Sequence, residues 1–194
     1  MKTKWIILIA LLMSAPIVMQ AQMKQRWGVK AGLNFSHISD FKKANSATSY
    51  HIGPMLEFMQ KKLSSTGIEA ALLYSRKGFD FDNQSKGVMN DYIEIPVNLK
   101  WRLNFPLVAP FLSVGPYANV LLGGEEKTYG SYSVDPSAFN FGLNFSAGLD
   151  IINVQLSLNF NWGLNDTYKI KGPNDIDPVS AKNRTFALAV AFLF

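Results

Sequence analysis

The sequence predicts an all-β protein, an eight-stranded antiparallel up-and-down transmembrane β-barrel. Apolar and polar residues alternate in about eight segments, long and short connections alternate between these segments, and the polar faces carry few charges. Successive side chains of a strand point to opposite faces, so this alternation indicates strands that separate two different surroundings. A closed barrel also leaves no strand edge unpaired in a membrane.

Five of the expected strands alternate almost without interruption, and three do so less regularly. The regular segments are 26–35, 92–103, 139–150, 153–162 and 185–194. The less regular ones are 49–60, 65–77 and 108–122, and two of them are interrupted by Gly53-Pro54 and Gly115-Pro116. Because proline cannot donate to a β-ladder, we expect bulges or kinks at these pairs. A length of about 10–14 residues exceeds the roughly 9–11 that a tilted strand needs to cross a bilayer.

The connections between these segments alternate in length. Long polar connections lie near 37–48, 78–89, 123–137 and 164–183. Short connections lie near 61–64, 104–107 and 150–153. Short periplasmic turns and long outer loops are typical of outer-membrane barrels, so we expect both chain termini on the periplasmic side.

The chain begins with a stretch typical of a secretory signal peptide. Lys2 and Lys4 precede an apolar run that begins at Trp5, and the segment ends in MQAQ, which predicts cleavage after Ala21. An N-terminal membrane anchor is the alternative, which the shortness of the apolar run disfavours. We therefore expect a signal peptide over 1–21 and an outer-membrane barrel over 22–194.

Composition narrows the class of protein further. The chain contains no cysteine, which excludes disulfides and a lipidated N-terminal cysteine. The net charge of +5 includes Lys2 and Lys4 and is spread evenly, so it does not indicate nucleic acid as a partner. We expect no cofactor either.

The polar faces distinguish a membrane barrel from a soluble barrel that encloses a ligand. In the last three strands these faces hold Asn, Gly, Ser, Gln, Thr and Ala, with Asp150 as almost the only charge. A soluble exterior carries about a quarter to a third of charged residues. Small polar residues suit a narrow lumen instead, and the large apolar residues then face lipid.

Aromatic residues lie near the ends of the expected strands and predict two girdles. The inner girdle would contain Trp27, Phe58, Trp101 and Phe194. The outer girdle would contain Phe35, Tyr50, Tyr74, Phe139, Trp162 and Phe186. Such girdles mark the two membrane interfaces of outer-membrane barrels.

The signal peptide, WGVKAGLNFS, YIEIPVNLKW, VGPYANVLLGG and the terminal phenylalanine together resemble the porin-family outer-membrane β-barrels of the PorT-like type, in the outer membrane protein beta-barrel domain group. The resemblance covers essentially the whole mature chain. It implies a Gram-negative outer membrane, with membrane lipid and the barrel-assembly machinery as partners. It also implies that Phe192 and Phe194 form the C-terminal signal read by that machinery.

Catalytic and metal sites are poorly supported by the sequence. His37 has Ser36, Ser39 and Asp40 nearby, which allows a lipid-modifying hydrolase as an alternative, but closeness in a loop does not make a catalytic constellation. His51 is expected to face the lumen as a hydrogen-bonded polar residue. Two isolated histidines do not make a metal site.

Charged residues on the inward faces form the candidate site. The six expected in the lumen are Lys30, Glu57, Glu69, Glu94, Lys100 and Arg102. Buried charges need partners, so we expect an ion-paired plug, with a narrow path for small solutes as the alternative. The sequence thus favours a non-enzymatic barrel that acts in envelope structure or through its outer loops in binding or secretion. Transport through a narrow pore or lateral path, and lipid modification, remain the alternatives.

Overall fold

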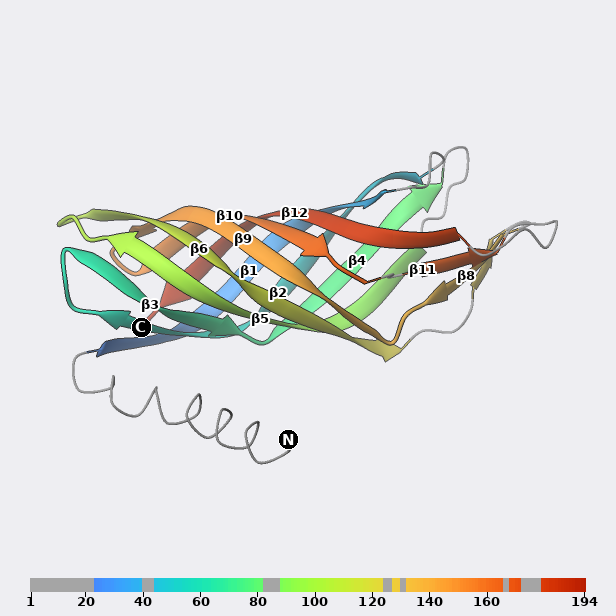
Figure 1. Ribbon diagram of the computed structural model, residues 1–194. Helices are drawn as coiled ribbons and strands as arrows, with labels where there is room; N and C mark the ends of the chain where they lie inside the picture. The colour runs from blue at the N-terminus through green and yellow to red at the C-terminus, as the bar shows by residue number, and fades with distance from the viewer. Residues whose placement is uncertain are drawn as a thin grey trace, which may run out of the picture.

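The architecture is that of a long, closed barrel, shown in the computed structural model of Figure 1. The structure describes residues 23–39, 44–81, 88–123, 127–129, 132–165, 168–171 and 179–194. The predicted signal peptide over 1–21 lies outside these residues. Within the described part of the chain, no helix has the length and apolar character needed to cross a membrane.

Antiparallel pairing between neighbouring strands builds the barrel wall. In order, the wall consists of β1 (Met23–Ser39), β2 (Ala44–Gln60), β3 (Ser64–Ala71) with β4 (Leu73–Phe81), β5 (Val88–Leu103), β6 (Val108–Gly123), β9 (Phe139–Ile151), β10 (Val154–Gly163) and β12 (Val179–Leu193). Strands β3 and β4 continue each other and are separated only by Leu72, so the described wall has the eight strands predicted. Pairing of β1 with β12 closes it, from Gly28 opposite Leu193 to Ser39 opposite Lys182.

The short connections lie at one end of the barrel, together with the C-terminus (Figure 1). They join β2 to β3, β5 to β6, and β9 to β10, as the alternation of loop lengths predicted. We call this end the periplasmic end and the opposite one the outer end, following the loop lengths of outer-membrane barrels.

Several strands are longer than expected. β1 and β2 have 17 residues each, and β5 and β6 have 16 each. At the outer end of β1, polar residues predicted to begin a loop still pair with β12, and His37 lies opposite Arg184. Backbone hydrogen bonds do not require apolar side chains, so pairing continues where the hydrophobic pattern stops.

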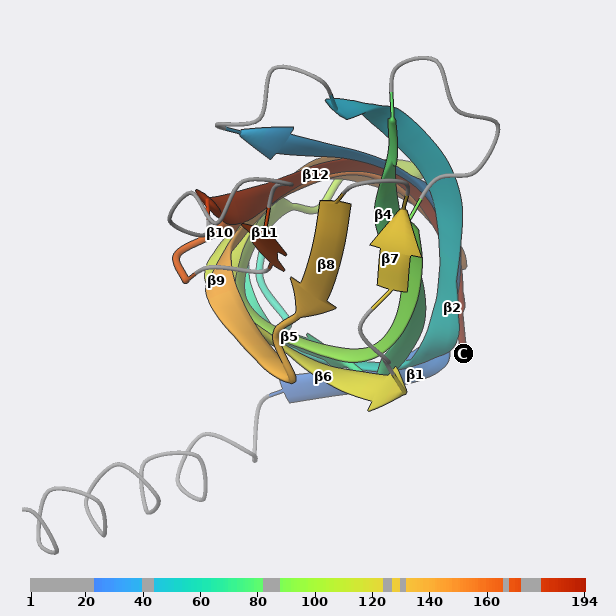
Figure 2. The ribbon, with the colours of Figure 1, turned by 90° about the vertical axis from the view of Figure 1, so that its right-hand side faces the viewer.

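A small outer sheet occupies part of two predicted loops. β7 (Lys127–Tyr129), β8 (Tyr132–Pro136) and β11 (Tyr168–Lys171) extend from the start of β12 in the order β12, β11, β8, β7. Figure 2, seen from the outer end, shows β7 and β8 across the opening of the barrel. The connections near 123–137 and 164–183 are therefore partly strand.

The two Gly-Pro pairs do not produce bulges. Pro54 lies opposite Leu72, whose N–H donates to the Pro54 carbonyl at 3.0 Å, and the strand register is the same on both sides. The register shifts instead between Ser46 and His51 and between Asp91 and Tyr92. At Gly115 a Cβ would lie 2.0 Å from the Val97 carbonyl oxygen, so glycine there permits a close backbone approach. Proline removes a donor without forcing an extra residue into the strand.

Burial alternates along the strands as predicted, with apolar residues outward. In β10, Leu156 and Leu158 are 41% and 47% exposed, whereas Gln155, Ser157 and Asn159 are buried. The polar faces therefore line the lumen, and the apolar faces form a continuous outer surface. This inverted arrangement is stable where the surroundings of the barrel are lipid.

Candidate functional site

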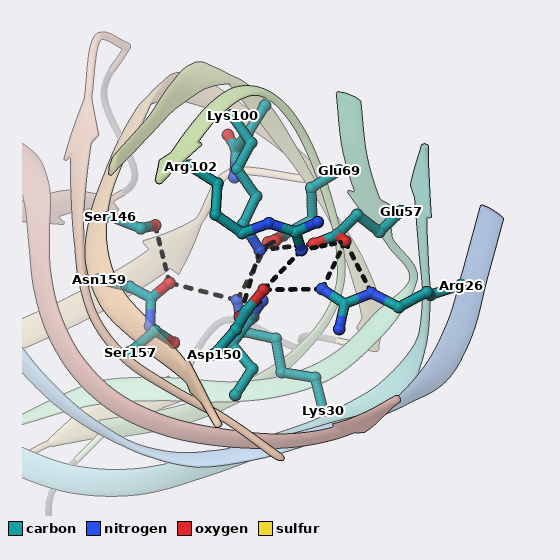
Figure 3. A network of polar contacts seen from close by, with 12 residues as sticks. Arg26, Lys30, Glu57, Glu69, Lys100, Arg102, Ser146, Asp150, Ser157 and Asn159 are labelled. Carbon is teal, nitrogen blue, oxygen red and sulfur yellow. Dashed lines mark hydrogen bonds and ion pairs between the residues drawn. The ribbon is translucent and has the colours of Figure 1, made fainter. Parts of the chain in front are cut away.

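Seven charged side chains converge in the periplasmic half of the lumen, as Figure 3 shows. They are Arg26, Lys30, Glu57, Glu69, Lys100, Arg102 and Asp150, and none is more than 7% exposed. We call this group the lumen network. It joins β1, β2, β3, β5 and β9, so it connects opposite sides of the barrel.

Lys100 lies at the centre of the lumen network. Its Nζ is 2.6 Å from Glu57 Oε2, 3.1 Å from Glu69 Oε2 and 3.7 Å from Asp150 Oδ1. The same nitrogen lies 3.9 Å from the centroid of the Phe111 ring. The buried ammonium thus has carboxylates and an aromatic face as partners, which compensates for its lost hydration.

Two arginines bridge the same pair of carboxylates. Arg26 donates from Nε to Glu57 Oε1 at 2.9 Å and from Nη2 to Asp150 Oδ2 at 2.7 Å. Arg102 donates from Nη1 to Glu57 Oε1 at 3.0 Å and to Asp150 Oδ2 at 2.7 Å. Glu57 and Asp150 come from opposite parts of the wall, so the arginines tie the wall together across the lumen.

The strand register explains how local sequence brings these groups together. Glu57 lies directly opposite Glu69 in the β2–β3 pair, and Lys100 lies opposite Gly67 in the β3–β5 pair. Two facing carboxylates would repel each other without the ammonium between them. Room for the Phe111 ring comes from Gly148, where a Cβ would lie 2.6 Å from Phe111 Cζ.

Five of the six predicted lumen charges belong to this network, and Glu94 does not. Glu94 forms an ion pair with Lys77, nearer the outer end, and accepts a hydrogen bond from Asn161 at 2.9 Å. The ring of Tyr117 lies 5.3 Å from Lys77 Nζ. The lumen therefore contains the seven-residue lumen network and, apart from it, the Lys77–Glu94 ion pair, rather than one cluster of the six predicted charges.

Two members of the network were missed as partners by sequence reasoning. Arg26 has the same inward parity as Lys30, but it lies at the start of its segment. Asp150 was recognised on the polar face of its strand, but β9 does not neighbour β1, so counting along hairpins could not join it to Arg26. The alternation of the strands could show that both side chains face the lumen, but the sequence does not give the distance between them across the lumen.

Amide and hydroxyl side chains fill the lumen between the two charged groups. Asn98 donates to Asn144 at 2.8 Å, Asn144 to Asn161 at 2.5 Å, and Asn161 to Glu94. Lys30 donates to Asn159 at 3.2 Å and so joins these amides to the lumen network. On the β9 and β10 side of the lumen, neutral hydrogen-bonded side chains thus take the place of ion pairs.

The free space in this middle part of the lumen is small. A cavity of about 20 Å³ is lined by residues that include Lys30, His51 and Glu94. This volume holds about one water molecule. His51 accepts or donates through Nδ1 at 2.7 Å from Asn34 Oδ1, while its buried Nε2 has no partner among the described residues. His51 is thus the lumen-facing, hydrogen-bonded residue expected.

The predicted girdle residues lie on the outer wall near both ends. At the periplasmic end, Trp27 stacks on Phe194 with ring centroids 4.7 Å apart, and Trp101 donates to Ser64 Oγ at 3.0 Å. At the outer end, Tyr50 and Tyr74 lie 6.0 Å apart. Phe139 and Trp162, also in the outer set, are 52% and 45% exposed. Phe192 contacts Phe194 edge to face at 4.9 Å.

The side chains around His37 that could form a catalytic constellation are not part of the described structure. The side chains of Ser36, His37 and Ser39, and all of Asp40, lie outside what the structure describes. No group of three or more His, Cys, Asp or Glu residues in the described ranges could hold a metal ion.

Apolar side chains on the outside and polar side chains that fill the lumen are the features of an outer-membrane β-barrel. A family model described as the outer membrane protein beta-barrel domain matches residues 20–169. The chain belongs to this family, which locates it in the outer membrane. A search of curated proteins finds no match.

Solved structures with a similar course of the chain are also outer-membrane barrels. Ail, the attachment invasion locus protein of Yersinia pestis, is 12% identical, with 88% of this chain and 99% of Ail covered and a TM-score of 0.44. The N-terminal barrel domain of Pseudomonas aeruginosa OprF is 12% identical, with 86% and 97% covered and a TM-score of 0.42. Neisserial surface protein A is 14% identical, with 89% and 99% covered and a TM-score of 0.41. Likenesses this distant carry no argument about what this chain does.

Proposed function

We propose that this chain is a non-enzymatic outer-membrane barrel with a closed lumen that acts in envelope structure or through its outer loops in binding or secretion. The lumen network is the observation that carries the proposal. Its ion pairs cross the barrel, and opening a path would separate charges that are buried. Breaking a buried pair costs about 3–5 kcal/mol, which opposes opening.

The outer end supports a role for the loops. β1, β2 and β12 continue past the outer aromatic residues, and β7, β8 and β11 add a small sheet there. Binding loops function best on a rigid scaffold, which this extension supplies.

Export and insertion complete the proposed function. The signal peptide over 1–21 would be removed after Ala21, and the barrel would fold against outer-membrane lipid with help from the barrel-assembly machinery. Phe192 and Phe194 would supply the assembly signal. Both side chains are exposed on the outer wall at the C-terminus, Phe192 in β12 and Phe194 directly after it.

Planar bilayer recordings test the closed lumen. The refolded chain should give no unitary conductance. The double variant Arg26→Ser with Asp150→Ser, which removes two facing side chains of opposite charge, should also give none, because the amides and the Lys77–Glu94 pair still fill the lumen toward its outer end. Reproducible conductance steps from the unmodified chain would reject the closed lumen and favour the transport alternative.

Two further measurements address enzymatic activity and assembly. Mass spectrometry of lipid A should show no change when the gene is deleted, and altered acylation would favour the lipid-modifying alternative.

Removal of Phe194 should reduce the amount of heat-modifiable barrel in isolated outer membranes more than it reduces the refolding yield in detergent. Normal insertion in cells would leave Phe194 as a girdle residue only.

A further inference from the structure

The periplasmic mouth of the lumen presents hydrogen-bond donors that have no partner among the described residues. Arg102 directs only Nη1 at Glu57 and Asp150. Its Nε is buried and unpartnered, and its Nη2 bonds to no described residue. Arg26, by contrast, engages Glu57 with Nε and Nη2 together. The edge of Arg102 that could bind an oxyanion through two parallel hydrogen bonds therefore has no acceptor within the described part of the chain.

Positive charge is in excess at this mouth. The lumen network contains four cationic side chains and three carboxylates. Lys24, Lys61 and Lys62 lie beyond it, are exposed, and form no ion pair with any described residue. An unbalanced group of cations attracts a counter-anion, and a phosphate supplies both charge and several acceptor oxygens.

Space for a ligand adjoins these cations. Two neighbouring cavities of about 170 and 440 Å³ share Lys24, Arg102 and Asn104 in their walls. Asn104 also fixes the mouth, because its N–H donates to the Leu63 carbonyl at 2.7 Å and its side chain to the Lys62 carbonyl at 2.5 Å. Two turns are thereby held in a fixed relation around the cavities.

Exposed apolar side chains surround the same mouth. Leu63, Phe105, Leu107 and Ile152 are 69%, 55%, 68% and 70% exposed. Ile152 also has a φ of 57°, a conformation that costs a β-branched residue energy. Little of its side chain is packed within the barrel, so its apolar surface is free to contact something outside the chain.

Membrane depth identifies the source of the anion. Lys24 lies three residues from Trp27, and Arg102 follows Trp101. Tryptophan rings on the outer wall of a barrel lie at the level of the lipid headgroups. The cationic mouth therefore lies near the depth of the phosphates of the inner leaflet, with apolar side chains beside it.

We propose that the periplasmic mouth is a binding site for the phosphate group of an inner-leaflet phospholipid. Arg102 grips the phosphate through Nε and Nη2, Lys24 and Lys62 neutralise its charge, and the apolar rim contacts the glycerol and the first acyl carbons. Asn104 is a positioning residue that holds the two turns. The site shares Arg102 with the lumen network and does not involve the outer loops.

Native mass spectrometry of the full-length refolded barrel in maltoside detergent, titrated with phosphatidylglycerol, tests the site. One lipid should be retained with higher affinity than diacylglycerol, which lacks phosphate. Lys24→Gln and Lys62→Gln should each weaken retention about fivefold, the effect of one basic residue near an anionic surface. Arg184→Gln, at the exposed outer end of β12, is the matched control and should leave retention unchanged.

Arg102→Lys keeps the charge, removes the two-point grip and should weaken retention further. Because Arg102 also belongs to the lumen network, heat-modifiable mobility must first show that this variant folds. The two lysine variants test the site even if the Arg102→Lys variant does not fold. Equal losses for Arg184→Gln and Lys24→Gln would overturn the site. Equal affinity for inorganic pyrophosphate would overturn the lipid as its source.

Discussion

The two sides of the lumen compensate for the burial of polar side chains in different ways. On β1, β2, β3 and β5 the inward residues include most of the charges, and they meet in ion pairs. On β9 and β10 the inward residues are mainly Asn, Ser and Gln, joined by hydrogen bonds between neutral groups. The charged side concentrates its stabilisation in a few contacts, whereas the neutral side distributes it over many. Single substitutions should therefore have unequal effects on the two sides.

The largest effect should come from Glu57→Gln. Glu57 accepts from Arg26, Lys100 and Arg102, so its neutralisation leaves three cations with fewer partners. We expect a loss of about 3–5 kcal/mol in the free energy of unfolding, the cost of an uncompensated buried charge. Urea titration in lipid vesicles measures it. Asp91→Asn makes the same change in the ion pair with Arg76, whose two side chains are 44% and 39% exposed, and as the matched control it should cost at most about 1 kcal/mol.

Arginine on the lipid-facing wall should have the next largest effect. Leu156 pairs with Val190, which lies midway between Phe186 in β12 and Phe194 directly after that strand. Leu156→Arg should therefore destabilise the barrel by about 2–4 kcal/mol in vesicles, the cost of arginine near the bilayer midplane. Leu164→Arg, on the same face beyond the outer end of β10, should cost much less. Equal small losses at both positions would mean that this face does not meet lipid.

Coupling energies should resolve the contacts within the charged side. Lys100→Met combined with Glu69→Gln should destabilise less than the sum of the single changes, with an interaction energy of about 0.5–3 kcal/mol. The corresponding cycle with Glu57→Gln should give the larger coupling, because Lys100 Nζ is 2.6 Å from Glu57 and 3.1 Å from Glu69. A coupling near zero with both carboxylates would show that Lys100 is not held as the structure indicates.

The smallest effect should come from the neutral side. Asn159 accepts from Lys30 and Ser146 and donates to Ser157. Asn159→Ala should nevertheless cost only about 1 kcal/mol in the same urea titration, since a net hydrogen bond contributes about 0.5–1.5 kcal/mol and its neighbours can rearrange. A loss as large as that of Glu57→Gln would refute the contrast between the two sides.

The sequence was sufficient to predict the barrel and the facing of its residues. Alternation placed Leu156 outward and Lys100 inward, and hairpin counting brought Glu57 near Glu69. It could not place Glu94, whose partner Lys77 lies at the end of an irregular segment, nor connect Asp150 to Arg26 across the lumen. The outer extensions of β1 and β2 and the small sheet of β7, β8 and β11 were also missed, because backbone pairing there does not follow an apolar pattern.

Contacts within the lumen network span long stretches of chain, with Arg26 and Asp150 separated by 124 positions. Asp150 is the last of the seven residues along the chain, so the lumen network is complete only when β9 has joined β1 to β5. Buried cations without enough carboxylates are costly, so we expect the cations to stay hydrated until β9 is in place. Loss of water from this part of the lumen should therefore follow the docking of β9.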